Sequence, residues 1–424
     1  AAFESGWRDM PPGQRAELLH GLAKRIRDNV EAIAQLETRN VGKPIGDARW
    51  EADAGAKVFE YYAGAIGHLC GRTIPVARGG FDFTLRQPMG VIAAITPWNF
   101  PFLIACWKVA PALAAGNPVV LKPASLTPLT ALLLGQLAQE AGLPDGVLQV
   151  LPGAGAEAGN ALTTHPLVRK ISFTGSTEVG SKIMKLAADD IKRVSLELGG
   201  KSPNIVFADA DWQRAAAESP MSVFANTGQD CCARSRMFIE QSIFDDFVNQ
   251  FVAATESLKI GDPTLDETQL GPMVSAAQRE ISESFVTEAR GAGRDIRTGG
   301  DRPDGSGFYL NPAVIIGVEI GDRAWREEIF GPVVCLRPFT DEAKMLREVN
   351  DTNFGLSGSI WSNDLSRALR VARQVESGVI SINTHSSVHT EAPFGGFKRS
   401  GLGRDLGMSA MEACTEIKNI YVGE

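Results

Sequence analysis

Short apolar runs that alternate with helix-forming stretches constrain the fold of this chain more than any other feature of its sequence. Four such runs stand at residues 90–95, 118–121, 148–151 and 170–173, and a turn and a helical stretch follow each of them. A buried parallel strand is a nearly continuous apolar run, and a helix is the usual crossover between two such strands. The pattern therefore predicts an α/β fold built on a parallel sheet.

The same alternation starts again after Gly199-Gly200, which indicates a second α/β domain. Strands are expected at residues 204–207 and 379–382, and a helix is expected at 211–225. No internal repeat or low-complexity tract interrupts this pattern. Two parallel sheets in succession are therefore expected.

Three segments differ from this pattern. Residues 11–67 have helical periodicity and precede the first expected strand. Residues 70–88 are rich in glycine and alternate like a β-hairpin, and residues 416–422 alternate like an edge strand. A small β element made of residues 70–88 and 416–422 is therefore expected beside the sheets.

Charge and cysteine content exclude several classes of protein. The 424 residues carry a formal net charge of −8 and no long basic block, so nucleic-acid binding is not expected. No apolar run approaches the roughly 18 residues that span a bilayer, and the N-terminus lacks the apolar core of a signal peptide. Six cysteines in so long a chain predict no disulfide framework, and the scattered histidines predict no metal site. A cytoplasmic enzyme with reduced thiols and no membrane partner is expected.

Two adjacent cysteines, Cys231 and Cys232, stand in the polar segment 224–236 (FANTGQDCCARSR). A structural cysteine usually lies among apolar residues, whereas glycine, glutamine, aspartate and arginine surround this pair. Such surroundings suit a thiol that a substrate reaches and that is partly ionised. From these residues alone either cysteine could react, and a structural role is the more frequent alternative.

Two polar segments stand at the ends of expected strands, where parallel sheets bind ligands. Residues 96–101 (TPWNFP) place Asn99 between two prolines, which would aim its amide toward an oxyanion. Lys122 directly follows the next strand and could meet a ribose or a phosphate. The alternatives are a proline-rich turn with a capping asparagine and a solvated lysine.

Two further segments follow later strands of the first sheet. Residues 173–180 (FTGSTEVG) predict a strand, a turn and a helix whose N-terminus could hold a pyrophosphate, although the spacing is not G-x-G-x-x-G. The glycines of 153–159 also lack that spacing, and their pattern is typical of a plain loop. Glu197 lies between two leucines, where a raised pKa would make it a usable general base. The alternative is a half-exposed strand glutamate.

Together with residues 327–332 (EEIFGP) and 393–398 (PFGGFK), these segments resemble the NAD(P)-dependent aldehyde dehydrogenase superfamily, in its order and at its spacings over essentially the whole chain. The resemblance implies an α/β fold with a Rossmann-like parallel-sheet cofactor domain, a second α/β catalytic domain and a small β oligomerisation arm. The expected divisions are residues 1–69 and 89–199, residues 200–400, and residues 70–88 with 415–424, respectively.

The resemblance also implies the chemistry. It assigns the nucleophile to Cys231, two residues after Gln229, and the general base to Glu197, and it assigns Asn99 to the oxyanion and a catalytic role to Lys108. The implied reaction passes through a thiohemiacetal and a thioester, and the presence of Glu197 favours hydrolysis over transfer to coenzyme A. The positions assigned to the cofactor are Ile95, Thr96, Pro97, Trp98, Lys122, Ser125, Gly155, Gly159, Phe173, Thr174, Gly175, Ser176, Val179, Leu198, Gly199, Gln278, Glu328 and Phe330.

Three departures from the family pattern carry expectations. Ser125 stands where the family often has a glutamate, which would repel a 2′-phosphate by about 4 kcal/mol per charge pair at about 4 Å and an effective dielectric near 20. NAD or NADP is therefore expected, with NADP tolerated. Asp405 replaces a commoner glutamate after Arg404. Family members usually carry several dozen residues before the stretch that resembles residues 3–6, so a truncated front is expected.

The resemblance places an apolar substrate tunnel at Phe100, Phe102, Ile104, Trp107 and Phe394. An uncharged aliphatic or aromatic aldehyde is the expected substrate. An amino- or betaine-type aldehyde is the alternative, through cation–π contact with Trp107 and the charge of Glu391. The hairpin and the last strand need covering, so a homodimer or homotetramer is expected.

A cysteine hydrolase or a thiol-redox protein is the alternative from a different class. A hydrolase needs a histidine and an acid beside its nucleophile, and His165, His385 and His389 show no recognisable arrangement of that kind. A non-catalytic protein on the same fold would not need Cys231 and Glu197 together. The physiological aldehyde stays open.

Overall fold

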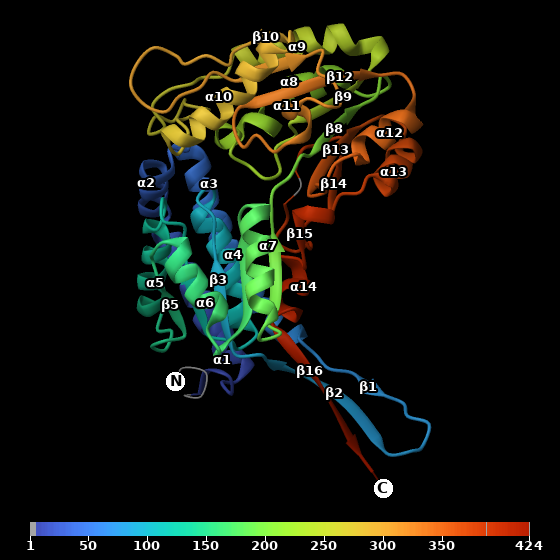
Figure 1. The fold of residues 1–424 in the computed structure, drawn as a ribbon. Helices are drawn as coiled ribbons and strands as arrows, with labels where there is room; N and C mark the ends of the chain where they lie inside the picture. Colours follow the sequence, from blue (N-terminus) through green and yellow to red (C-terminus); the bar gives the residue numbers. More distant parts are fainter. Residues whose placement is uncertain (1–5, 387, 424) are drawn as a thin grey trace.

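Two parallel sheets, which the chain enters one after the other, form the body of the protein, and a narrow β arm projects from it (Figure 1). The computed structural model describes residues 6–386 and 388–423. The arm leaves the first sheet on the side away from the second sheet (Figure 1). The fold class expected from the alternating pattern is confirmed.

The helical segment before the first sheet is divided into three helices. Gly42 ends the second helix in the left-handed region at φ 93°, and Pro44 directly precedes the third. Leu22 and Phe59 are fully buried in the core that these helices share with the first sheet. The helices are α1 (Pro12–Asp28), α2 (Val30–Val41) and α3 (Ile45–Ala65).

The first sheet has five parallel strands and one short antiparallel edge strand. In sheet order they are β15 (Gly401–Leu402), β7 (Arg193–Glu197), β6 (Val168–Thr174), β3 (Val91–Ile95), β4 (Val119–Lys122) and β5 (Leu148–Val150). The helices of this layer are α4 (Pro101–Ala114), α5 (Leu129–Glu140), α6 (Asn160–Thr164), α7 (Thr177–Ala188) and α14 (Gly407–Glu412). Every residue of α4 is buried, as expected of a helix that is apolar on all sides.

The second sheet has seven strands. Six of them are parallel, and the remaining one, which stands first in sheet order, is antiparallel to its neighbour. The strands in sheet order are β10 (Asp295–Thr298), β11 (Ala313–Ile316), β12 (Val333–Phe339), β9 (Arg236–Glu240), β8 (Pro203–Val206), β13 (Ser357–Trp361) and β14 (Val379–Ile382). The helices are α8 (Trp212–Phe224), α9 (Phe244–Glu256), α10 (Ala276–Gly291), α11 (Arg323–Arg326), α12 (Glu342–Asn350) and α13 (Leu365–Gln374).

The arm joins the predicted hairpin to the end of the chain. Strands β1 (Thr73–Ile74), β2 (Phe81–Pro88) and β16 (Thr415–Val422) form an antiparallel sheet with β2 in the middle. The pairing runs from Thr415 opposite Pro88 to Val422 opposite Phe81. Phe81 and Ile417 are 53% and 63% exposed, so the arm presents apolar side chains to its surroundings.

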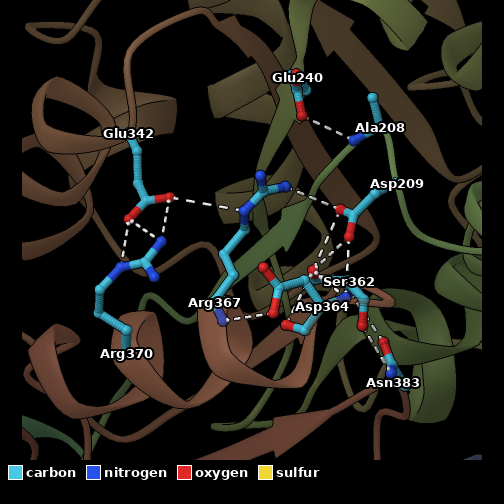
Figure 2. Close-up of polar contacts among 9 residues, drawn as sticks. All are labelled: Ala208, Asp209, Glu240, Glu342, Ser362, Asp364, Arg367, Arg370 and Asn383. Atoms are coloured by element: carbon cyan, nitrogen blue, oxygen red, sulfur yellow. Dashed lines mark hydrogen bonds and ion pairs between the residues drawn. The ribbon is translucent and has the colours of Figure 1, made fainter.

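Figure 2 shows a polar network at the carboxyl ends of β8, β13 and β14. Asp209 accepts a hydrogen bond from the hydroxyl of Ser362 at 2.9 Å and pairs with Arg367 at 3.0 Å. Asn383 exchanges two hydrogen bonds of 3.0 Å with the backbone of Ser362. The network therefore fixes the point at which the chain leaves β14 toward residues 384–394.

The two sheets face each other across a cavity, to which each contributes the ends of its strands or the turns before them. The first sheet presents the carboxyl ends of its parallel strands, and the second presents the turns that precede β9 and β12. Thr174, Cys231 and Glu328 come from these two edges and border one cavity. The functional residues are therefore found at this junction. Within the described ranges, no helix has both the length and the apolar character that crossing a bilayer requires.

Candidate active site

Cys231 lies in the turn between α8 and β9, where two cavities meet. The first cavity has a volume of about 620 Å³ and the second about 570 Å³, and Cys231 borders both. Its side chain is partly exposed, whereas Cys232 is only 6% exposed. Cys231 is therefore the thiol that ligands in both cavities can reach.

The turn that carries Cys231 is held in a strained backbone conformation. Asn226 and Thr227 have φ angles of 49° and 57°, and such angles cost roughly 1–3 kcal/mol each for residues other than glycine. The amide of Gln229 donates to the carbonyl of Asn226 at 3.0 Å, and its oxygen accepts from the backbone of Val274 at 2.9 Å. These bonds stabilise the turn and explain why a glutamine stands two residues before Cys231.

Asn99 is tied to the same turn from the first sheet. It is buried, it borders the first cavity, and its amide donates to the carbonyl of Gln229 at 3.0 Å. Asn226 donates to the carbonyl of Asn99 at 2.9 Å. A side-chain amide has two N–H donors, and the Gln229 bond uses one of them. The arrangement fixes Asn99 against the Cys231 turn, on the lining of a cavity that Cys231 also borders.

Glu197 ends β7 and borders the second cavity together with Cys231. Its carboxyl is buried, and its Oε2 has no hydrogen-bond partner among the residues that the structure describes. Burial and the nearby charge of Asp405 raise its pKa well above the ordinary value, and Lys108 opposes this shift. The half-exposed alternative is therefore wrong, and the carboxyl has the surroundings that a general base needs.

Lys108 does not border either cavity. Its ammonium is buried, pairs with Asp405 at 2.9 Å and donates to the hydroxyl of Ser172 at 3.2 Å. Its charge lowers the pKa of Glu197, so Lys108 acts on the carboxyl electrostatically from outside both cavity linings. The expected catalytic role of Lys108 is corrected to a positioning role for this reason.

Gly199 and Gly200 allow close packing between the two sheets. A Cβ on Gly200 would lie 2.2 Å from the carbonyl oxygen of Cys231, and a Cβ on Gly199 would lie 2.2 Å from the carboxylate of Glu328. The backbone N–H of Gly200 donates to Glu328 at 2.8 Å. Burial raises the pKa of Glu328 to about 7. Both glycines are therefore required by the approach of the Cys231 turn and Glu328 to the end of β7.

The first cavity fits an elongated polar ligand. The hydroxyls of Thr96 and Thr174 are buried and have no partner among the described residues, so they are available to such a ligand. The N-terminus of α7 opens on the cavity, and Ser176 caps it by accepting from the backbone of Val179 at 3.3 Å. Trp98 and Phe330 meet edge to face at 5.2 Å. Every position that the family resemblance assigns to the cofactor borders this cavity.

Five other residues of the first cavity were not expected. Lys182 and Ile183 lie three and four residues after Val179, on the same face of α7, so helical spacing could have identified them. Nothing in the sequence distinguishes the other three. The unexpected residues are Ala124, Ala156, Asn160, Lys182 and Ile183.

The wall of the second cavity follows one face of α4. Phe100, Ile104 and Trp107 border it as expected, and the ring of Trp107 meets Phe394 at 5.4 Å. Phe102 does not border it: it is fully buried, and a Cβ on Gly55 would lie 2.7 Å from its ring. The expectation for Phe102 is wrong because residues 100, 103, 104 and 107 share one helical face, and this spacing selects Leu103 instead.

Charged residues from α3, from the loop before it and from α8 also border the second cavity, and the sequence did not suggest them. Lys43 pairs with Glu51 and lies 4.4 Å from the ring of Phe100. Asp47 and Glu218 border the cavity without an ion-pair partner among the described residues. Burial raises the pKa of Asp47. Glu391, which was expected near the substrate, is exposed and lies outside the cavity lining.

His385 borders the second cavity but is not arranged as a base for Cys231. Its two ring nitrogens lie 3.3 Å from the hydroxyl of Ser219 and 3.2 Å from that of Ser359. Burial and the charges of Arg234 and Arg214 lower its pKa to about 3. These contacts occupy both nitrogens, so the geometry gives no support to a cysteine hydrolase.

The surroundings of Cys231 disfavour its thiolate. Its hydrogen bond with the thiol of Cys232, its burial and the charges of Asp230 and Glu197 raise its pKa well above the ordinary value. This direction runs against the expectation of a partly ionised thiol, because the carboxylates of Asp230 and Glu197 act on the sulfur. Formation of the thiolate must accompany the reaction.

The aldehyde dehydrogenase family model matches residues 1–420. Aminoaldehyde dehydrogenase 2 of Pisum sativum is 43% identical over 426 residues, which cover 99% of this chain and 85% of the pea protein. Betaine aldehyde dehydrogenase 1 of Oryza sativa subsp. japonica is 43% identical over 420 residues, covering 98% and 83%. The NAD+ complex of a Bacillus cereus aldehyde dehydrogenase superposes with a TM-score of 0.98 at 38% identity, covering 100% and 86%.

Proposed function

The chain belongs to the aldehyde dehydrogenase family, and we propose that Cys231, Glu197 and Asn99 carry out its oxidation of an aldehyde to a carboxylic acid with NAD(P)+. One observation supports this assignment above the others. Cys231 borders both cavities, with the Asn99 amide on the first and the Glu197 carboxyl on the second. A nucleophile at the junction can react with an aldehyde from one cavity and face a hydride acceptor in the other.

The first step is addition of the Cys231 sulfur to the aldehyde carbonyl. The thiol proton must leave as the sulfur–carbon bond forms, because the resting thiol is neutral. Glu197 borders the same cavity, and its ionised form is the group placed to accept that proton. The developing oxyanion would be held by the Asn99 amide and a backbone N–H of the Cys231 turn.

The first cavity is the proposed cofactor site, and a nicotinamide dinucleotide bound there would supply the hydride acceptor. The N-terminus of α7 would hold its pyrophosphate, and the free hydroxyls of Thr96 and Thr174 offer donors to its polar groups. Lys122 and Glu328 border the same cavity and are the candidates for the ribose hydroxyls. The named residues position the ligand and exclude water around Cys231.

Release of the product requires water and a base. After the proton taken from Cys231 has passed to solvent, Glu197 removes a proton from the attacking water, whose oxygen adds to the acyl carbon of the thioester. The carbon–sulfur bond then breaks, and the sulfur takes up that proton to return the Cys231 thiol. The unpartnered Oε2 of Glu197 is available to this water. The charge of Asp405 raises the pKa of the Glu197 carboxyl, and the charge of Lys108, which pairs with Asp405, lowers it.

The cofactor site supports use of NADP as well as NAD. Ser125 borders the first cavity and its hydroxyl donates to the carbonyl of Gly153 at 3.0 Å, so no carboxylate stands at this position. Lys122 and Lys182 border the same cavity and add positive charge. These features favour acceptance of a 2′-phosphate.

The apolar wall of the second cavity supports an uncharged aliphatic or aromatic aldehyde as the substrate. The second candidate is an amino- or betaine-type aldehyde, which the unpaired carboxylates of Asp47 and Glu218 and the nearby rings of Phe100 and Trp107 favour. The pea and rice relatives carry the names of such enzymes. Comparison of kcat/KM for butyraldehyde and 4-aminobutyraldehyde separates the two candidates, and Glu218→Gln should lower only the second value.

The arm is the proposed contact with further copies of the chain. Its exposed apolar residues and the free edge of β16 need covering. Pairing with an identical arm would cover both, and this supports a homodimer or homotetramer. Sedimentation of the wild type and of Ile417→Asp tests this: dissociation of the variant is expected, and an unchanged mass would contradict it.

The reaction itself is tested by the absorbance of NAD(P)H after a short aldehyde is added to the purified protein with either cofactor. We expect aldehyde-dependent reduction, with the acid as the product. Absence of reduction across a panel of uncharged and cationic aldehydes would contradict the proposal.

A further inference from the structure

Three consecutive residues of the Cys231 turn bring metal-binding atoms together. Asp230, Cys231 and Cys232 offer one carboxylate oxygen and two sulfurs that all lie within 4.8 Å of one another. Both cysteines are free thiols. All three residues border the second cavity, so a small ion in that cavity can reach every donor.

The local backbone explains why neighbours in sequence converge here. The backbone N–H of Cys232 donates to Oδ1 of Asp230 at 2.8 Å, which folds the carboxylate back over the two thiols. A carboxylate has a second oxygen with free lone pairs. The side chain of Gln229 donates to the carbonyl of Asn226 and holds the turn, and Gly200 leaves room for the carbonyl of Cys231. The donors are therefore arranged in advance and do not depend on a change of fold.

We propose that Asp230, Cys231 and Cys232 form an inhibitory binding site for a soft divalent cation, of which Zn²⁺ is the representative. Thiolate sulfur and carboxylate oxygen are both ligands of zinc, and thiolates favour soft cations over Mg²⁺ or Ca²⁺. Three protein ligands leave a fourth position for water from the cavity. As the two sulfur–metal bonds form, the two thiol protons pass to solvent, and no electron is transferred.

A cation at this site would block the reaction directly. The sulfur of Cys231 would donate to the metal the electron pair that otherwise attacks the aldehyde. The site is not catalytic, so it adds no metal to the reaction. The inhibition rests on the proposed function of Cys231, whereas the binding of the cation does not.

The other cysteines provide a matched control. Cys70 is exposed and stands alone, and Cys106, Cys335 and Cys414 are buried. A cation that binds thiols without regard to geometry would choose Cys70, whereas the proposed site requires the adjacent pair. Cys70→Ser and Cys232→Ser therefore make opposite predictions.

The binding test uses Cd²⁺ as a probe, because its bond to thiolate absorbs in the ultraviolet. The full chain is stripped with a chelator, desalted and titrated. We expect one Cd²⁺ per chain, displacement by Zn²⁺, and no change in Cys70→Ser. Cys232→Ser should bind about 10- to 100-fold more weakly, since loss of even a group that only orients a ligand costs that much. Equal affinity in Cys232→Ser, or loss of the signal in Cys70→Ser, would overturn the site.

A second measurement separates this site from the proposed function. Residual aldehyde oxidation under Zn²⁺ is measured for each variant relative to its own rate without metal, and a chelator is then added. We expect reversible inhibition that is weakened in Cys232→Ser by the same factor as Cd²⁺ binding. If the Cd²⁺ signal appears but no aldehyde is oxidised in any condition, the site stands and the proposed function fails. If Cd²⁺ binds and oxidation is insensitive to Zn²⁺, the inhibitory role fails.

Discussion

The side-chain amide of Asn99 donates a 3.0 Å hydrogen bond to the backbone carbonyl of Gln229, which joins the first sheet to the turn that carries Cys231. Asn226 returns a bond to the carbonyl of Asn99 at 2.9 Å. The proposed oxyanion donor and the proposed nucleophile are therefore parts of one rigid unit.

Replacement of Asn99 should lower turnover more than it lowers substrate binding. Loss of one oxyanion donor costs about 2.7–4 kcal/mol of barrier, or about 10²–10³ in kcat, so Asn99→Ala should lose that much with a small change in KM. Steady-state kinetics measure both constants. A matched Asn160→Ala variant, which removes a partly buried amide from the far part of the first cavity, controls for general damage. A loss in kcat below tenfold for Asn99→Ala would contradict its assignment to the oxyanion.

Replacement of Glu197 should stabilise the protein and at the same time greatly lower its turnover. Its pKa is raised in the folded state, so folding favours the protonated carboxyl and stability falls as pH rises from the ordinary value of about 4.3 through the raised value. Glu197→Gln removes this dependence. The variant should melt at a higher temperature than the wild type at neutral pH, and the difference should shrink toward about pH 5.

Thermal unfolding at several pH values measures this effect, and kcat measures the catalytic loss, which is about 10²–10⁴ for a general base. Asp405→Asn is the useful comparison, because it removes the charge that adds to the shift without removing the base. A Glu197→Gln variant that is less stable than the wild type by the same amount at every pH would show that the carboxyl is not held in its neutral form.

Trp107 and Phe102 should respond differently although both lie on α4. Trp107 borders the second cavity, whereas Phe102 is fully buried against Gly55. Trp107→Ala should raise KM for an apolar aldehyde. Phe102→Ala should cost about 3–5 kcal/mol of folding free energy and leave KM nearly unchanged. Chemical denaturation measures the folding free energy of the two variants, and steady-state kinetics measure their KM. A KM effect confined to Phe102→Ala would contradict the assignment of Trp107 to the cavity face of α4.

Much of this arrangement follows from sequence patterns, and the exceptions have physical causes. The parallel sheets follow from the apolar runs, and the strand ends carry Lys122 and Glu197 as expected. The family resemblance assigns Phe102 to the wall, whereas the spacing of residues 100, 103, 104 and 107 favours Leu103. A step of one residue, about 100° around the helix axis, moves a side chain from cavity to core.

The features that depend on contacts between distant parts of the chain could not be predicted from local sequence patterns. Nothing in the residues Asn226 and Thr227 predicts two successive left-handed φ angles, because the strain is offset by bonds from Gln229 and from Thr227 to Gly271. The pKa of Cys231 depends on the carboxylates of Asp230 and Glu197, which only the fold brings near the sulfur. The charged residues of the second cavity could not be predicted for the same reason. Asp47 and Glu218 come from α3 and α8, and only the fold brings these helices to one cavity.

Ser125 should determine tolerance of the 2′-phosphate. Ser125→Glu places a carboxylate in the first cavity, where each charge pair is worth about 4 kcal/mol at about 4 Å and an effective dielectric near 20. The dissociation constant of NADP should rise by about tenfold or more, and that of NAD should change little. Calorimetric titration of both cofactors measures this without turnover. Equal weakening of the two would indicate damage to the cavity instead.

The direct test of the account is aldehyde-dependent formation of NAD(P)H by Cys231→Ala and Cys232→Ala, measured side by side with the wild type. Cys231→Ala should show no aldehyde oxidation while still binding the cofactor. Cys232→Ala should keep most of the turnover, because its thiol neighbours the nucleophile without taking part in a step. Loss of oxidation in Cys232→Ala with retention in Cys231→Ala would contradict the central assignment.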